Sequence, residues 1–82
     1  MNEREILINN LNKIHTTELG ILRIKRNLKV DSDVVNYCKD KIINVNSTVV
    51  KKGKNFYITK DNLTITINSY SYTIITAHKI KD

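Results

Sequence analysis

The sequence predicts an α+β fold, in which two to three N-terminal helices pack on one face of a four-stranded antiparallel sheet. Apolar residues recur at helical spacing in residues 1–44 and at alternating positions in residues 45–82. The alternating segments are joined by two or three turn residues, and connections this short require antiparallel pairing. The 82 residues contain no proline and only two glycines, so residues 1–82 are expected to form a single domain.

The first predicted helix runs from about Glu3 to Ile14, because Leu7, Leu11 and Ile14 recur at helical spacing. The run His15-Thr16-Thr17 interrupts this pattern. Either threonine can cap a second helix, since a side-chain oxygen at that position accepts a free N–H of the first turn.

The apolar face of the second helix consists of Ile21, Ile24 and Leu28. The segment 30–33, with its aspartates and serine, then predicts the start of a third helix, whose buried stripe is Val34 or Val35, then Cys38 and Ile42. Cys38 is the only cysteine, which excludes an internal disulfide and a cysteine-based zinc site. On this stripe it is expected to be a small buried hydrophobic residue rather than a nucleophile.

Four strands are predicted in the second half, where the period changes to two. Their expected ranges are Thr48–Lys52, Asn55–Thr59, Leu63–Asn68 and Tyr70–His78. Gly53-Lys54, Lys60-Asp61-Asn62 and Asn68-Ser69 are the expected turns.

Alternation divides the strand residues between the two faces of the sheet. The face expected to pack against the helices holds Phe56, Ile58, Leu63, Ile65, Ile67, Ile75 and Ala77. The opposite, uncovered face is expected to show Tyr57, Thr59, Thr64, Thr66, Asn68, Tyr72, Ile74, Thr76 and His78. Such a face is typical of a sheet that is covered on one side only, and it is also a possible platform for a nucleic-acid strand.

The chain carries a formal charge of +6, which lies mainly in the sheet half. Residues 1–44 contain eight Lys or Arg and six Asp or Glu, whereas residues 45–82 contain six and two. A basic surface attracts phosphate backbones or other anionic partners. Ile, Asn and Lys make up 35 of the 82 residues, so the codon bias of an AT-rich bacterial or phage genome also explains part of the lysine content.

The residues expected to carry a function follow from this charge and from the two histidines. His15 and His78 could act as base and acid in phosphodiester cleavage if they meet in one cleft, and independent surface roles are the alternative. The expected nucleic-acid-binding residues are Arg23, Lys52, Lys54, Tyr57, Tyr72 and Thr76. Neither histidine has the spacing of a metal ligand, so neither a metal site nor a cofactor is expected.

Several segments of the sequence together carry a resemblance to a known family. They are the runs 15–20 (HTTELG), 23–28 (RIKRNL), 52–57 (KGKNFY), 65–68 (ITIN) and 71–79 (SYTIITAHK). Together they resemble a family of short bacterial proteins of unknown function, domain of unknown function 3781, and this resemblance implies no site residues. The layout of helices followed by an antiparallel sheet is also loosely similar to the small metal-independent ribonucleases of the RelE and barnase type.

Two functional hypotheses follow from the sequence. The first is an RNA-binding protein, with a metal-independent ribonuclease or a toxin-like domain as its enzymatic form. The second is a non-enzymatic inhibitor or adaptor, encoded by a phage or plasmid, that binds another protein through the sheet face or an edge strand. A protein partner would be an antitoxin if the protein is a toxin, or an inhibited target if it is an inhibitor. A cytoplasmic location, no membrane association, and a monomer or homodimer are expected.

Overall fold

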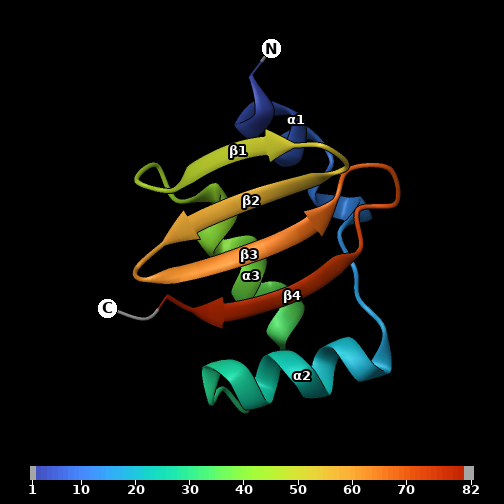
Figure 1. Cartoon of the computed structure of the whole chain (residues 1–82), viewed down its shortest axis with the longest axis vertical. Coiled ribbons are helices and arrows are strands. Elements are labelled where there is room, and N and C mark those ends of the chain that lie inside the picture. Colours follow the sequence, from blue (N-terminus) through green and yellow to red (C-terminus); the bar gives the residue numbers. More distant parts are fainter. Residues whose placement is uncertain (1, 81–82) are drawn as a thin grey trace.

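The computed structural model describes residues 2–80. Within this range the chain forms three α-helices, a short 3-10 turn and a four-stranded antiparallel sheet, which confirms the predicted fold class (Figure 1). In chain order the elements are α1 (Glu3–Asn9), η1 (Leu11–Lys13), α2 (Glu18–Leu28), α3 (Val34–Ile43), β1 (Thr48–Lys52), β2 (Asn55–Lys60), β3 (Leu63–Asn68) and β4 (Ile74–Lys79).

The strands follow one another across the sheet in the order β1-β2-β3-β4, and two tight turns set the register of the first three. Lys52 pairs with Asn55 across a two-residue turn whose first residue, Gly53, has a φ of 61°. Asp61 and Asn62 form the next turn, with φ angles of 51° and 62°. Left-handed residues at these positions give the turn a twist that matches the strands it joins.

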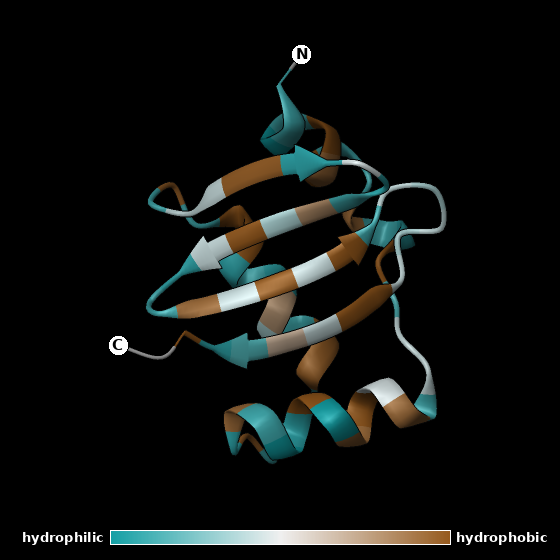
Figure 2. Ribbon diagram, viewed as in Figure 1, coloured by the Kyte–Doolittle hydropathy of each residue, from teal (hydrophilic) through white to brown (hydrophobic). Residues whose placement is uncertain are grey.

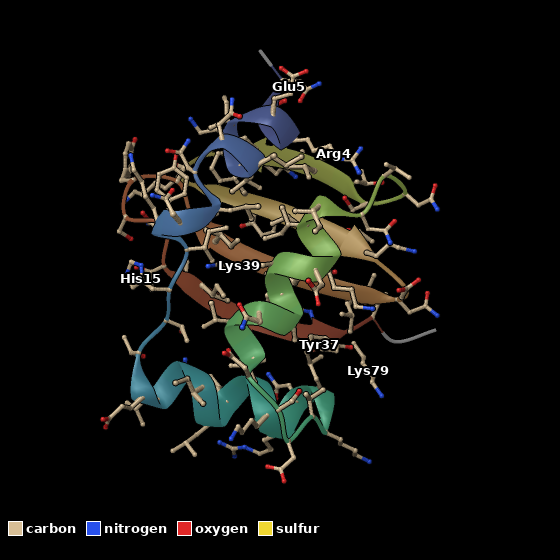
Figure 3. The ribbon with its side chains drawn as sticks, turned by 180° about the vertical axis from the view of Figure 1, so that it is seen from behind. Arg4, Glu5, His15, Tyr37, Lys39 and Lys79 are labelled. Atoms are coloured by element: carbon tan, nitrogen blue, oxygen red, sulfur yellow. The ribbon has the colours of Figure 1, made fainter. Side chains whose placement is uncertain are left out.

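The helices leave one face of the sheet uncovered. α3 crosses behind the sheet, α1 lies behind the β1 side and α2 runs alongside β4 (Figures 1 and 3). The predicted caps start two of these helices. Thr17 Oγ1 accepts the Gly20 N–H at 3.0 Å, and Asp33 Oδ1 accepts from Val35 and Asn36 at 3.1 and 3.2 Å.

The core fills the space between the helices and the back of the sheet. Figure 2 shows the hydrophobic bands of the strands alternating with polar ones, as expected for a sheet with one buried face. The buried apolar residues include Leu7, Ile14, Ile24, Leu28, Val34, Cys38, Ile42, Phe56, Ile58, Leu63, Ile65, Ile67, Ile74 and Ala77. Cys38 is fully buried, and burial raises the pKa of its thiol to about 12, which confirms its predicted role as a core residue.

The first helix is shorter than predicted. α1 ends at Asn9, and a 3-10 turn replaces the expected continuation to Ile14. The Asn10 side chain donates to the Ile6 carbonyl at 2.7 Å. Asparagine side chains compete in this way with the backbone bonds of a helix, which explains the early end.

The start of the last strand was also predicted wrongly. Residues 69–73 form a loop instead of the first half of β4, because the Asn68 side chain accepts the N–H groups of Tyr70 and Ser71 at 2.9 and 3.0 Å. An asparagine side chain that bonds to the two following residues is a turn-forming device.

A β-bulge then reverses the predicted orientations of Ile74 and Ile75. Thr66 pairs with Thr76, but Ile67 pairs with Ile74, so Ile75 is an extra residue in β4. Ile74 is 1% exposed and lies in the core, whereas Ile75 is 39% exposed. The prediction had assigned these two side chains to the opposite faces.

The two edges of the sheet differ. The outer edge of β4 is occupied, because Ile74 donates to the His15 carbonyl at 2.7 Å, Thr16 donates to Ile74 at 2.9 Å, and Asn27 of α2 donates to the Ala77 carbonyl at 3.3 Å. Within residues 2–80, β1 has a strand neighbour on one side only. It is short and ends in two lysines, features that protect an edge from pairing with other chains.

Candidate nucleic-acid interface

The open face of the sheet is defined by three rows of side chains that the strand register places next to one another. They are Thr48–Thr59–Thr64–His78, Val50–Tyr57–Thr66–Thr76 and Lys52–Asn55–Asn68. Eight of these eleven residues carry a hydroxyl or amide group, and two more are Lys52 and His78. The open face predicted from alternation is therefore present, with hydrogen-bonding groups on all of its rows.

The side chains in the middle of the open face are closely packed. Thr66 is 8% exposed although no helix crosses this face, because its neighbours Tyr57 and Thr76 stand on either side of it. Tyr57 is half-buried, and its hydroxyl accepts from Asn55 at 3.4 Å. The ring therefore lies among neighbouring side chains while part of it remains exposed, and bases stack on such aromatic rings.

Positive charge borders the open face at the turn between β1 and β2. Lys52 and Lys54 are exposed there, and neither forms a salt bridge within residues 2–80. Arg23 lies on α2 one turn before Asn27, whose amide contacts the Thr76 hydroxyl at 3.5 Å. Arg23 itself is exposed on α2 and lies outside the three rows of the open face.

The carboxylate nearest to this sheet in sequence does not offset that charge. Between residues 45 and 80, Asp61 is the only acidic residue. It accepts from Lys60 at 2.7 Å and from Lys41 at 2.9 Å, and both bonds lower the pKa of its carboxyl. Within residues 45–80, no carboxylate is therefore paired with the lysines at the β1–β2 turn.

The structure does not bring the two histidines together. His15 lies beside Thr73 ahead of β4, and His78 lies near the end of β4, opposite Thr64. Five residues of extended chain separate Thr73 from His78, which corresponds to about 16 Å. The two histidines therefore lie at opposite ends of β4 and do not share the single cleft that the predicted acid–base pair requires. His78 belongs to the open face, and His15 does not.

His15 takes part in a hydrogen-bond chain that fixes the loop 69–73. Its Nδ1 is 2.8 Å from the Lys13 carbonyl and its Nε2 is 3.2 Å from Thr73 Oγ1, which in turn is 2.8 Å from Ser71 Oγ. Figure 3 shows His15 at the side of the molecule, away from α3. These hydrogen bonds join the connection before α2 to the loop before β4. They give His15 a structural role in holding the two segments together.

Tyr72 lies on the helix side of the sheet and not on the open face, contrary to the prediction. Its φ of 59° turns the side chain back, so that the ring stacks on Phe56 with 6.4 Å between ring centroids. The Lys13 ammonium lies 5.8 Å from the centre of the same ring. The residue belongs to the margin of the core, and the alternation rule failed because Tyr72 is in a loop.

Tyr70 is the exposed aromatic residue that the sequence analysis missed. It is 77% exposed, and the Ser69 N–H donates to the Lys54 carbonyl at 2.7 Å, which holds this loop against the β1–β2 turn. Tyr70 and Lys54 thus come from adjacent loops at the same end of the sheet. The turn signal of Asn68-Ser69 is the feature that points to the exposure of Tyr70, since a residue at the tip of a loop does not follow strand alternation.

The described part of the chain, residues 2–80, contains neither a pocket nor a group of three or more His, Cys, Asp or Glu side chains that could hold a metal ion. None of the helices in that range is long and apolar enough to cross a membrane. The surface that remains as a candidate site is the open face with its basic border.

Comparison with known proteins identifies a family. The family model described as "Protein of unknown function (DUF3781)" matches residues 8–78. The chain belongs to this family. The match extends from α1 to His78 and so includes all eleven residues of the open face. No curated protein and no solved structure matches the chain, and the likeness to RelE and barnase-type ribonucleases therefore rests on layout alone.

Proposed function

We propose that this DUF3781 protein binds single-stranded RNA on the open face of its sheet. The observation that carries the proposal is the combination of an uncovered face, rich in hydroxyl and amide groups, with unpaired lysines at one border. Bases can stack on Tyr57 and Tyr70, while Lys52 and Lys54 contact phosphates. Hydroxyl groups in rows can bond to base edges and to the ribose 2′-OH.

The proposal concerns binding and does not require cleavage. A histidine acid–base pair plays no part in it, because His15 and His78 lie at opposite ends of β4. His78 can contribute to the surface beside Thr64. The single cysteine is buried and needs no oxidising compartment, and such a role would be exercised in the cytoplasm, where RNA is abundant.

The test is fluorescence anisotropy with a labelled 12-nucleotide single-stranded RNA between 50 and 300 mM NaCl. Lys52→Glu/Lys54→Glu should weaken binding at least tenfold at the low-salt end. Because each phosphate contact contributes about 0.7 to the slope of log K against log salt, the double variant should also lower that slope by about 1.4. Tyr57→Leu should lose about 1–3 kcal/mol of binding free energy, because it removes the ring on which a base stacks, and Tyr57→Phe should retain this contribution.

The matched control is Lys29→Glu/Lys39→Glu, which changes the net charge equally at the residue that caps the end of α2 and at a position on α3. Figure 3 shows Lys39 on α3, behind the sheet. The control should retain most of the affinity. Binding that is absent, insensitive to salt, or weakened equally by both double variants would contradict the proposal.

A further inference from the structure

The outward side of α2 carries apolar residues that do not pack in the core. Leu19 and Leu22 are 69% and 61% exposed, although α2 already buries Ile24 and Leu28 on its other side. Exposed leucines are common singly, but two neighbouring leucines on one helix face form a patch that suggests a partner.

Two arginines lie on the same side of the helix. Positions 19, 22, 23 and 26 have the spacing i, i+3, i+4 and i+7, which places Leu19, Leu22, Arg23 and Arg26 in one stripe, here called the α2 outer face. Neither arginine forms a salt bridge within residues 2–80, whereas Lys25 on the neighbouring side lies 4.0 Å from Asp31. The α2 outer face is therefore apolar and cationic, with both guanidinium groups free to bind a carboxylate.

The surrounding charge strengthens this character. From residue 18 to residue 29, Arg23, Lys25, Arg26 and Lys29 stand against a single acidic residue, Glu18. Arginine binds carboxylates through two parallel hydrogen bonds, and it is enriched together with large apolar residues at protein interfaces. A complementary partner must offer leucine-sized apolar groups flanked by Asp or Glu.

We infer that the α2 outer face is a docking site for an acidic amphipathic helix of a partner protein. A nucleic acid would leave the two leucines uncovered. A second copy of the chain would gather four arginines in one interface, with only Glu18 from each copy to neutralise them. Two leucines on a helix of 11 residues bury too little apolar area for stable membrane attachment. The inference does not depend on RNA binding.

The experiment is an NMR titration of the ¹⁵N-labelled protein with two synthetic peptides. Both peptides carry leucine at i, i+3, i+4 and i+7, and they have glutamate in one case and lysine in the other at the remaining positions. The glutamate peptide should shift the amide signals of α2 in a saturable way, and the lysine peptide should not. The signals of the open face, including Thr64 and Thr66, should stay unchanged.

Variants separate the apolar from the ionic contribution. Leu19→Gln/Leu22→Gln should weaken binding of the glutamate peptide at least tenfold, and its exposed positions leave the fold intact. Arg23→Glu/Arg26→Glu should lose this peptide and bind the lysine peptide in its place. Val45→Gln is the matched control, because Val45 is 81% exposed and lies outside α2. It should leave the affinity unchanged.

Four outcomes would overturn the inference. The first is the absence of a saturable shift up to about 1 mM peptide, which corresponds to a binding free energy of about −4 kcal/mol. The second is equal binding of both peptides, and the third is unchanged binding by the leucine variant. The fourth is a set of shifts centred on the sheet. Self-association of the free protein or attachment to phosphatidylserine vesicles, if lost in Leu19→Gln/Leu22→Gln, would assign the α2 outer face to a second copy or a lipid surface, and would also overturn it. None of these results affects the RNA measurement.

Discussion

Gly20 shows how one residue determines the position of α2. A Cβ atom at this position would collide with Thr16 Oγ1, and that hydroxyl donates to the Ile74 carbonyl at 2.9 Å. The absent side chain thus allows the helix to start close to the segment that covers the β4 edge. Glycine disfavours a helix interior, so its presence in the first turn of α2 reflects this close approach.

Asp61 is the residue whose titration should affect stability most directly. Its bonds to Lys60 and Lys41 lower the pKa of its carboxyl, so its stabilising effect is present above the unfolded pKa and is lost as the pH falls through the folded pKa. The bond to Asp61 likewise raises the pKa of Lys41, and this effect is present below the unfolded lysine value and is lost as the pH rises through the folded value. We expect Asp61→Asn to lower the urea midpoint between about pH 5 and pH 9, and to match the wild type at about pH 2.

The substitution leaves the turn intact, because asparagine tolerates the φ of 51° found at this position. Asp31→Asn is the control. The Asp31 side chain is fully exposed, and its nearest cation, Lys25, is 4.0 Å away. The urea midpoint of Asp31→Asn should equal that of the wild type at every pH, since exposed ion pairs at this distance contribute little to stability. A pH-independent difference between Asp61→Asn and the wild type would show that the effect comes from the turn and not from the ion pairs.

At the scale of elements, the bulge in β4 decides which side chains reach the core. Ile74 and Ile75 are chemically identical neighbours, so neither composition nor hydrophobicity distinguishes them. The loop 69–73 ends with Tyr72 in a left-handed conformation, and its hydrogen bonds place Ile74 beside His15 and opposite Ile67. The extra residue is then accommodated at Ile75, and alternation resumes from Thr76 onward.

The matched pair Ile74→Val and Ile75→Val tests this arrangement. Removing a methylene from the buried Ile74 should cost about 0.5–1.5 kcal/mol of the free energy of unfolding. The same change at the 39% exposed Ile75 should stay within about 0.5 kcal/mol. Urea denaturation followed by circular dichroism measures both. The opposite order would mean that β4 continues without a bulge, as simple alternation predicts.

At the scale of the whole molecule, the net charge of +6 on 82 residues should destabilise the compact state by self-repulsion. The ion pairs of Asp61 with Lys41 and Lys60 oppose this repulsion by stabilising the fold. Added salt screens both the repulsion and the attraction. We expect the urea midpoint at pH 7 to rise between 20 and 200 mM NaCl, because the like charges outnumber the paired ones. Lys52→Glu/Lys54→Glu, with its net charge of +2, should show a smaller rise. A midpoint that falls with salt would mean that the local ion pairs dominate.

The candidate site was predictable where it lies within regular strands and tight turns. Tyr57, Thr76 and His78 lie on the open face because alternation holds through β2, β3 and the second half of β4. Lys52 and Lys54 flank Gly53 as expected, since a two-residue turn leaves their side chains exposed. Tyr72 and Tyr70 escaped the prediction because loop conformation, and not period, determines where they point.

The sequence by itself determined the α+β class, the helix caps, the tight turns and the apolar and polar faces of β2 and β3. These features follow from interactions between residues close together in the chain, so local patterns encode them. Tertiary structure decided the bulge at Ile75, the inward turn of Tyr72 and the separation of His15 from His78. Each of these depends on contacts between residues far apart in the chain, namely 15 with 73 and 74, and 56 with 72, which no local pattern records.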